Sequence, residues 1–434
     1  MAAPCGQDQG TCLFAADGSL FAADAGRNGQ IKAFDSSGRI RPGWPIDAPS
    51  GANYSGGVGH GWQVALDGSL LVTTSTGITD IDQSGQVRPG WPVALAEGNS
   101  QILVEPSGTI AVVRDNPAAD EAWVYALTLA GNAPVVWSTR MSGDVSDATV
   151  APDGTIFLAS ADRGGGLGGT RFAVSTLDSD GKLIAGWSTS LWNAMVMTPS
   201  GDLAVVAYDS RANAAGTAYD ILRTHLSVLD RTGNTPAGWP RIINGPASVP
   251  AVGPDGAMYL IQGETVSTGS VLALDRSGQV EPGWPVSLPA GYAGVAGDRT
   301  SGRLNVSLPP IVANGLVYVA ASSQTSGRSL VSAFRVSGSD HTGWAYQVPT
   351  DSQFTGPMWT PVFASPAGVL YVLEQTSPSS GAVVALGTDG RTLPGWPYVF
   401  SPGPGGLTFL ADGGVGIYSM DFATRLTASG SPAS

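Results

Sequence analysis

The sequence predicts an all-β protein in which one four-stranded unit is repeated along the chain. A phrase that keeps Asp, Gly and Trp at constant spacing recurs, as in FDSSGRIRPGWP (34–45), IDQSGQVRPGWP (81–92) and LDRSGQVEPGWP (274–285). Short apolar runs bounded by Gly, Asn and Asp turns lie upstream of each copy, which is typical of β-hairpins. No stretch of twelve or more residues shows a convincing helical period.

The unit around the third copy shows where its four strands are expected. The runs SVPAVGP (248–254) and AMYLIQG (257–263) lie on either side of a Pro-Asp-Gly turn. The run SVLALD (270–275) ends at the Asp-x-x-Gly turn, and QVEPGWPV (279–286) carries the tryptophan. Alternating or continuous β-branched and aromatic residues between such turns indicate strands, so each unit predicts four of them.

The phrase has a structural interpretation of its own. An aspartate three residues before a glycine can accept backbone N–H groups while the glycine takes a positive φ; such aspartates are Asp35, Asp82, Asp178, Asp230 and Asp275. Each buried tryptophan removes about 150–250 Å² from water, which is worth roughly 4–6 kcal/mol of gross burial. We therefore predict a structural role for the eight tryptophans of the phrase: Trp44, Trp91, Trp137, Trp187, Trp239, Trp284, Trp344 and Trp396.

Repeated four-stranded units of about 50 residues are typical of a β-propeller. We predict a single β-propeller of eight or nine antiparallel blades over residues 13–430, with an N-terminal segment 1–12 and a tail 431–434. The sequence contains nine groups of three predicted strands but only eight tryptophan strands, because no tryptophan strand follows the group at 407–430. We favour nine blades with an incomplete last one, since an overhanging triplet would expose an edge. The residues before Cys12 do not look like the missing strand.

Two of the phrases also resemble a known repeat. ALDRSGQVEPGW (273–284) and AFDSSGRIRPGW (33–44) resemble the PQQ-like, or quinoprotein-type, propeller repeat, which implies a tryptophan that docks on the neighbouring blade. Several quinoprotein alcohol dehydrogenases in that family carry an adjacent cysteine pair, Ca²⁺ ligands and a catalytic aspartate. This chain has no adjacent cysteine pair, so the resemblance implies the fold, and we expect a non-enzymatic member.

Charge and composition restrict the partners. The formal net charge of −13 opposes binding to nucleic acid, because an acidic surface repels phosphates. No apolar run approaches the roughly 20 residues of a membrane-spanning helix. The alternatives for Cys5 and Cys12 are a local disulfide, which we favour, and two free thiols. A disulfide would indicate an extracellular or periplasmic location; no secretory leader precedes Ala2, so an exported protein would have lost it.

Candidate site residues lie on the loops that vary between units. The first-to-second and third-to-fourth turns are short, whereas the second-to-third and inter-blade loops differ widely, and variable loops on a rigid scaffold usually carry function. Aromatic rings there could stack on a sugar or anchor a protein, although Trp62, Trp192 and Trp359 could equally plug the space between blades. The candidate ligand-binding residues are Tyr54, His60, Trp62, Trp192, Tyr292, Asp298, Arg299, Phe354 and Trp359.

The sequence favours a binding scaffold over an enzyme. We expect an extracellular or envelope propeller that binds a protein or carbohydrate partner on the variable face, without a cofactor. Asp178 and Asp180 have Ca²⁺-like spacing, but further ligands are not near them in sequence. One alternative is a propeller enzyme, either quinoprotein-type or carbohydrate-active with Asp220, Asp298 or Asp351. The other is a self-assembling module whose incomplete last blade accepts a strand from another chain.

Overall fold

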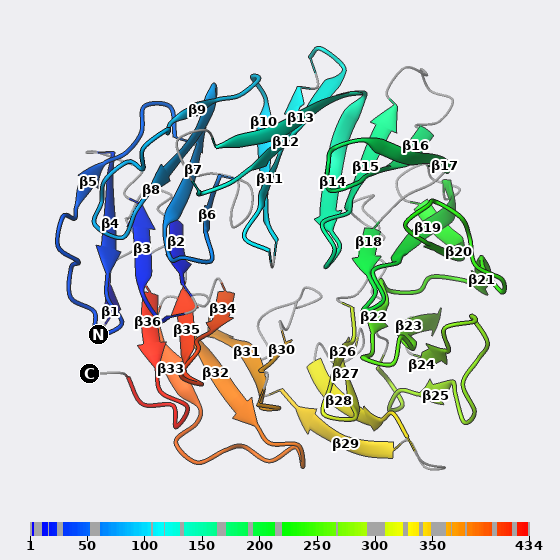
Figure 1. Ribbon diagram of the computed structural model, residues 1–434. Coiled ribbons are helices and arrows are strands. Elements are labelled where there is room, and N and C mark those ends of the chain that lie inside the picture. Colours follow the sequence, from blue (N-terminus) through cyan, green and yellow to red (C-terminus); the bar gives the residue numbers. More distant parts are fainter. Residues whose placement is uncertain are drawn as a thin grey trace. The chain divides into compact units, whose positions relative to one another are not determined.

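The fold was obtained as a computed structural model and consists of β-strands, turns and connecting loops (Figure 1). The described part contains no helix, and therefore none that could span a bilayer. The structure describes residues 2–3, 11–15, 17–23, 29–52, 61–105, 107–116, 118–130, 134–162, 171–189, 194–212, 219–265, 268–292, 309–323, 329–337, 342–348, 362–365, 367–377, 380–401, 406–418 and 423–432.

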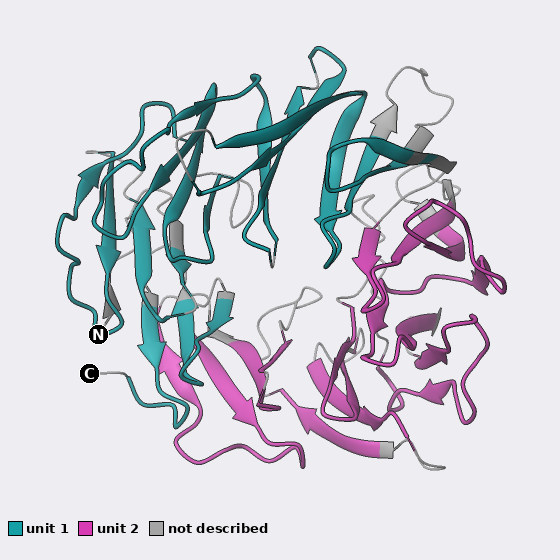
Figure 2. Ribbon diagram, in the orientation of Figure 1, with its two compact units in different colours: residues 1–190, 404–434 teal, residues 191–403 magenta. Residues whose placement is uncertain are grey.

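The chain forms two compact units, and residues 1–190 with 404–434 make up unit 1 (Figure 2). Its described residues form five four-stranded antiparallel sheets, here called blades 1–4 and 9. Blade 1 has β2 (Thr11–Phe14), β3 (Leu20–Ala23), β4 (Gln30–Phe34) and β5 (Ile46–Asp47); blade 2 has β6 (Trp62–Val64), β7 (Leu70–Thr74), β8 (Gly77–Ile81) and β9 (Val93–Ala94); blade 3 has β10 (Asn99–Val104), β11 (Ile110–Asn116), β12 (Glu121–Leu127) and β13 (Val135–Ser142). Blade 4 has β14 (Asp144–Val150), β15 (Ile156–Asp162), β16 (Arg171–Leu177) and β17 (Leu183–Thr189), and blade 9 has β34 (Gly406–Phe409), β35 (Val415–Tyr418), β36 (Ala423–Leu426) and β1 (Ala2–Ala3).

Residues 191–403 make up unit 2, which has four more such sheets, blades 5–8. Blade 5 has β18 (Ala194–Met197), β19 (Leu203–Ala212), β20 (Tyr219–Leu229) and β21 (Arg241–Asn244); blade 6 has β22 (Ala251–Val252), β23 (Met258–Thr265), β24 (Thr268–Leu274) and β25 (Val286–Ser287). Blade 7 has β26 (Ile311–Ala313), β27 (Leu316–Ser322), β28 (Ser329–Arg335) and β29 (Thr342–Gln347), and blade 8 has β30 (Val362–Ala364), β31 (Leu370–Ser377), β32 (Ser380–Leu386) and β33 (Tyr398–Phe400). The described residues thus confirm a β-propeller fold and decide for nine blades.

Blade 9 corrects one expectation from the sequence. Its first three strands, β34 to β36, follow one another in the chain, and its fourth is β1, with Ala2 opposite Thr424 and Ala3 opposite Ala423. The residues before Cys12 therefore do supply the missing strand. Two alanines carry no strand pattern of their own, and the pairing with β36 alone makes them a strand. This occupied position argues against the expectation that blade 9 accepts a strand from another chain.

The aspartate turns form as the phrase predicts. Oδ1 of Asp275 accepts the backbone N–H groups of Ser277 and Gln279, both at 2.8 Å, and Gly278 has a φ of 74°. The same two bonds, to the second and fourth residues after the aspartate, occur at Asp35, Asp82, Asp178 and Asp230. The carboxylate of Asp178 is thus used within a turn like the others.

The tryptophans join successive blades. Nε1 of four of them donates to a carbonyl oxygen in the turn of the next blade: Trp44 to Gln83 at 3.1 Å, Trp137 to Ser179 at 2.7 Å, Trp239 to Arg276 at 2.9 Å, and Trp344 to Thr388 at 2.8 Å. The glycine before Trp44 lets the two chains approach, because a Cβ on Gly43 would lie 1.9 Å from the Ser84 carbonyl oxygen. The side chain of Trp187 lies outside the described residues.

The core consists of apolar layers between adjacent blades. In unit 1, Ile31 and Trp44 of blade 1 cluster with Trp62 and Leu70 of blade 2. In unit 2, Val331 of blade 7 clusters in the same way with residues of blade 8. Each layer takes alternate residues of its strands, because successive side chains of a strand point to opposite faces. No blade could bury both faces alone, which is why the repeat is needed for stability.

Candidate functional site

Most of the site residues predicted from the sequence lie outside the described residues. These are Tyr54, His60, Trp192, Asp298, Arg299, Phe354 and Trp359. The same holds for Cys5, the side chain of Cys12, Asp351 and the side chain of Asp220. Their roles, including the disulfide, remain predictions, and the structure places only Trp62 and Tyr292.

Trp62 is a core residue. It begins β6, is 0% exposed and belongs to the apolar layer between blades 1 and 2. A ring without exposed surface cannot serve as a stacking platform for a ligand in this conformation. Of the two alternatives from the sequence, the structure supports the plug between blades.

Tyr292 is half-buried beside the last strand of blade 7. It follows β25 of blade 6, and its hydroxyl donates to Oε1 of Gln347 at 2.7 Å. Nε2 of Gln347 in turn donates to the carbonyl oxygen of Ser329 at 2.7 Å. The phenol group is therefore already hydrogen-bonded, and it ties the segment after blade 6 to β29.

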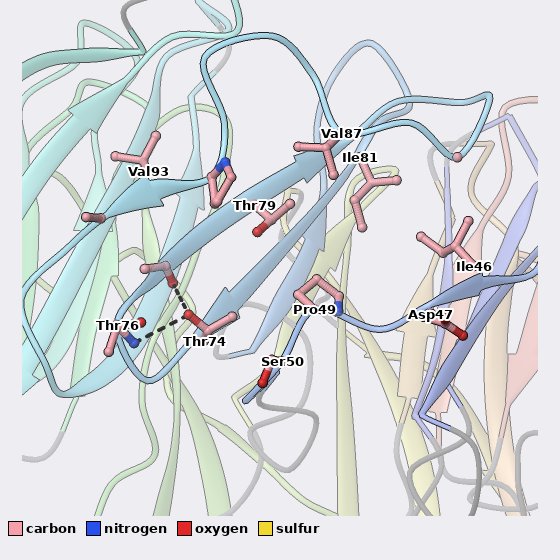
Figure 3. Close-up of a pocket in the computed structure, with 14 residues that line it drawn as sticks. Ile46, Asp47, Pro49, Ser50, Thr74, Thr76, Thr79, Ile81, Val87 and Val93 are labelled. Atoms are coloured by element: carbon pink, nitrogen blue, oxygen red, sulfur yellow. Dashed lines mark hydrogen bonds between the residues drawn. The ribbon is translucent and has the colours of Figure 1, made fainter.

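A groove of about 530 Å³ lies between blades 1 and 2 in unit 1 (Figure 3). Its volume falls in the range of about 300–1,000 Å³ that is typical of ligand sites. Blade 2 contributes alternate residues of β8, because Gly77, Thr79 and Ile81 share one face of that strand. The lining residues are Ile46, Asp47, Pro49, Ser50, Thr74, Thr76, Gly77, Thr79, Ile81, Gly85, Val87, Pro92, Val93 and Ala94.

The two ends of the groove differ in chemistry. Ile46, Ile81 and Val87 gather at one end, and Val87 is 50% exposed (Figure 3). Hydroxyl groups of Thr74 and Thr76 lie at the other end, where Thr74 Oγ1 accepts the Thr76 N–H at 3.4 Å. The groove can therefore bury an apolar side chain and offer hydrogen bonds to a polar one.

A buried arginine of blade 3 fixes the hydroxyl end. Arg114 is 1% exposed, and its guanidinium donates to the carbonyl oxygens of Thr74 at 2.9 Å, Ser75 at 2.5 Å and Ala96 at 2.8 Å, and to the Ser100 hydroxyl. Burial lowers the pKa of Arg114 from its usual value, but an arginine stays charged in a folded protein. Four charge-assisted bonds to one turn and its surroundings hold the groove wall in place.

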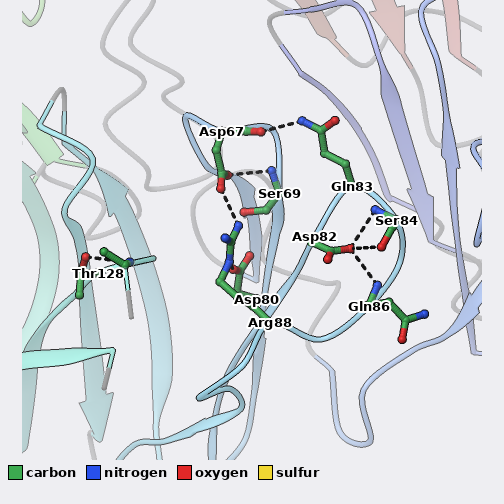
Figure 4. A network of polar contacts seen from close by, with 10 residues as sticks. Asp67, Ser69, Asp80, Asp82, Gln83, Ser84, Gln86, Arg88 and Thr128 are labelled. Atoms are coloured by element: carbon green, nitrogen blue, oxygen red, sulfur yellow. Dashed lines mark hydrogen bonds and ion pairs between the residues drawn. The ribbon is translucent and has the colours of Figure 1, made fainter. Parts of the chain in front are cut away.

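An ion-pair network lies in blade 2 (Figure 4). Arg88 donates through Nη2 to Asp67 at 2.5 Å and through Nε to Asp80, whose side chain is fully buried. Burial raises the pKa of Asp80. The Gln83 amide donates to the Asp67 carbonyl at 2.7 Å. Both carboxylates thus bind the arginine between them, which indicates a structural role at the first-hairpin turn of blade 2.

Unit 2 contains a buried acid at the boundary of blades 7 and 8. Glu374 is 5% exposed and accepts a hydrogen bond from the Tyr346 hydroxyl at 3.0 Å. Burial raises the pKa of Glu374 to about 7 and, together with the neighbouring carboxyl, raises the pKa of Tyr346. A carboxyl with a pKa near neutrality can change its charge at physiological pH.

A second titratable pair lies in blade 5. Nε2 of His225 and Oδ2 of Asp209 are 2.8 Å apart, with side chains 30% and 40% exposed. In the part of the chain that the structure describes, no three His, Cys, Asp or Glu side chains come together as a metal site. The enzyme alternative and the absence of a cofactor both remain untested expectations.

Sequence analysis missed Arg114 and Glu374, although both occupy one repeat position. Each lies six residues after the glycine of its first-hairpin turn, Gly108 or Gly368. Gln262 has the same place after Gly256, and its Nε2 donates to the Asn244 carbonyl in blade 5 at 3.2 Å. All three reach back to the preceding blade. Aligning the units on the turn glycine would have singled out this position as the one that carries polar side chains at strand centres.

Comparisons with known proteins support the fold alone. No family model and no curated protein matches the chain. A crystal structure described as the eukaryotic initiation factor has 12% identity and a TM-score of 0.57, with 95% of this chain and 89% of that chain covered. A quinoprotein alcohol dehydrogenase-like protein from Bacteroides thetaiotaomicron has 12% identity, covers 89% and 82%, and has a TM-score of 0.43. Sqt1 from Saccharomyces cerevisiae has 10% identity, covers 92% and 98%, and also has a TM-score of 0.43.

Proposed function

We propose that the protein is a non-enzymatic binding scaffold that acts outside the cytoplasm, and that an extended segment of a protein partner docks between blades 1 and 2. The observation that carries the proposal is the groove itself, with its apolar end at Val87 and its hydroxyl end at Thr76. The location outside the cytoplasm rests on the disulfide that the spacing of Cys5 and Cys12 predicts.

The shape of the groove favours a peptide segment as its occupant. It runs beside β8 and the two-residue strand β5, and the β8 wall presents every second residue of its strand. An extended peptide alternates its own side chains in the same way and is recognised by pockets for every second residue. The net charge of −13 favours a neutral or basic segment over an acidic one.

The walls are rigid enough to bind without large rearrangement. Trp44 and Gly43 lock blade 1 onto the β8–β9 turn, and Arg114 locks the β7–β8 turn onto blade 3. A preformed groove avoids part of the ordering cost that binding otherwise carries. A scaffold role therefore fits the way the repeat holds these blades.

The test is a displayed library of random twelve-residue peptides, selected on the immobilised full chain. We expect enrichment of sequences with a Val-, Ile- or Leu-sized anchor, and at least a tenfold loss of binding in Val87→Asp, since a charge at the apolar end is poorly solvated by its neighbours. The matched control is Val280→Asp, which changes the equivalent residue of blade 6; this residue is 52% exposed and is not among those that line the groove.

Three outcomes would contradict the proposal. They are a library without enriched peptides, enriched peptides that bind Val87→Asp as well as the unaltered chain, and selective binding on a glycan array in place of peptides. The last outcome would favour a carbohydrate partner.

A further inference from the structure

The strongest feature outside the groove is the contact of Glu374 with Tyr346 in unit 2. Glu374 lies in β31 of blade 8, on the face that also carries Leu370 and Val372, and these two pack against Val331 of blade 7. The acid therefore faces an apolar layer, with the Tyr346 hydroxyl at 3.0 Å as the donor to its Oε1. An ionised carboxylate in such a place is costly, whereas a neutral acid is tolerated.

The described residues around Glu374 offer its carboxylate no opposite charge. Among the described residues that pack in this layer, Tyr346 and Tyr318 are the titratable side chains on blade 7, and β30 and β32 contribute Val362, Val384 and Leu386. Tyr346 is the one group whose interaction shifts the titration of Glu374, beside burial itself. A lost proton is therefore not offset by a cation on the described elements.

Strand β29 links this acid to Tyr292, one of the candidate ligand-binding residues. Tyr346 points from one side of the strand to Glu374, and the next residue, Gln347, lies on the other side. Gln347 accepts the hydrogen bond of Tyr292, which follows β25 of blade 6. A shift of β29 away from blade 8 would therefore also move the partner of Tyr292.

We infer that Glu374 and Tyr346 form a proton-controlled latch: β29 stays against blade 8 while the acid is neutral, and the contact loosens when the acid releases its proton to water, because water solvates the ionised carboxylate better than the single Tyr346 bond can in this apolar layer. The loosening extends through Gln347 to the segment of Tyr292. The inference goes beyond the proposed groove, which lies in unit 1, and does not depend on it.

The repeat supports a latch at this position. Arg114 and Gln262, at the same distance from their turn glycines, also bond to the preceding blade. Of the three, only Glu374 can change its charge near neutral pH, because arginine and glutamine do not titrate there. The structure thus has a fixed latch at two blade boundaries and a titratable one between blades 7 and 8.

The first test compares the full chain with Glu374→Gln by denaturant unfolding between pH 5 and pH 8. Gln keeps an acceptor for Tyr346 but has no proton to lose. Because the folded pKa is raised above the unfolded one, the acid stabilises most below its unfolded pKa, and this stability is lost as the pH rises through about 7. The unfolding constant of the unaltered chain, relative to Glu374→Gln, should rise by about ten- to 100-fold over this range.

Two measurements separate a latch from a merely structural residue. Carboxyl-carbon NMR should show Glu374 titrating near neutrality, and higher still in Tyr346→Phe, because the lost bond stabilised the charged form. Amide exchange in β29 and around Tyr292 should accelerate with pH more in the unaltered chain than in Glu374→Gln. Asp389→Asn is the matched control, since Asp389 lies in the same blade with its side chain 61% exposed.

Each negative result overturns a definite part of the inference. An ordinary carboxyl titration near pH 4.5, or parallel pH profiles for the unaltered chain and Glu374→Gln, would contradict the latch. Exchange that changes in β29 and not around Tyr292 would contradict its extension to blade 6.

Discussion

Blades 6 and 7 end in different fourth strands, and the difference shows how the repeat stabilises its boundaries. In blade 6, Trp284 is followed by proline, β25 has only two residues, and the tryptophan is 7% exposed. In blade 7, Trp344 is followed by alanine, β29 has six residues, and the tryptophan is only partly buried. Proline has no N–H to donate, so the ladder cannot run through it.

The two kinds of strand contact the next blade differently. Two residues after the tryptophan, blade 6 has Val286, which packs in the apolar layer, and blade 7 has Tyr346, which bonds to Glu374. Blade 3 also lacks the proline, and there Thr139 donates to the Gly181 carbonyl oxygen at 2.5 Å. A short strand thus relies on buried apolar area, and a long one adds polar bonds between blades.

The largest effect should come from removing the tryptophans themselves. We expect Trp284→Ala to lower the free energy of unfolding by about 3–5 kcal/mol, as for other large-to-small core changes, because its ring is buried against Tyr259 and Phe334. Trp344→Ala should cost about 1–3 kcal/mol, since part of that ring is already in water. Denaturant unfolding measures both losses in free energy. Equal losses for Trp284→Ala and Trp344→Ala would contradict the proposed difference between the fourth strands of blades 6 and 7.

A smaller effect should follow from the polar bond of a long strand. Thr139→Val keeps the side-chain shape and removes the donor to Gly181, so it should cost about 1 kcal/mol. Val286→Thr offers the matched change in the short strand of blade 6. It should also destabilise, because it places a hydroxyl in the apolar layer. A stabilised Val286→Thr would show that the short strand does not depend on apolar burial.

The smallest effect concerns the turn that precedes the short strand. Asp275→Ala removes three bonds, from Ser277 N, Ser277 Oγ and Gln279 N, and should cost about 0.5 kcal/mol at neutral pH, because these bonds are exposed to water. Ser277 chiefly holds the pKa of Asp275 below its usual value, so the contribution is present above the unfolded pKa near 4 and is lost as the pH falls through the folded one. Asp389→Ala, which removes one bond, should cost less.

Local patterns predicted the repeating parts well. The aspartate turn depends on residues within five positions of one another, and the tryptophan strand is marked by its recurring Gly-Trp pair. Both can therefore be predicted from the sequence. The number of blades was left between eight and nine because β1 consists of Ala2 and Ala3, which carry no strand signal. Only their partner, β36, makes them a strand.

The sites were harder to predict, for physical reasons. Glu374 and Arg114 look like solvent-facing residues in their strands, and only the packing of neighbouring blades buries them. The groove likewise arises between two blades whose separate sequences show no cavity. For Trp62 the sequence left a ligand platform and a plug between blades open, and only the packing decides, because the ring lies in the apolar layer between blades 1 and 2.

The pairing of β1 with β36 also has a consequence for synthesis. Ala2 leaves the ribosome some 400 residues before its partner Thr424. At about 5–20 residues per second, β1 waits on the order of 20–80 s before blade 9 can be completed. During that time β1 has no β36 to pair with, so blade 9 can be completed only after the strands of blades 1–8 have been synthesised.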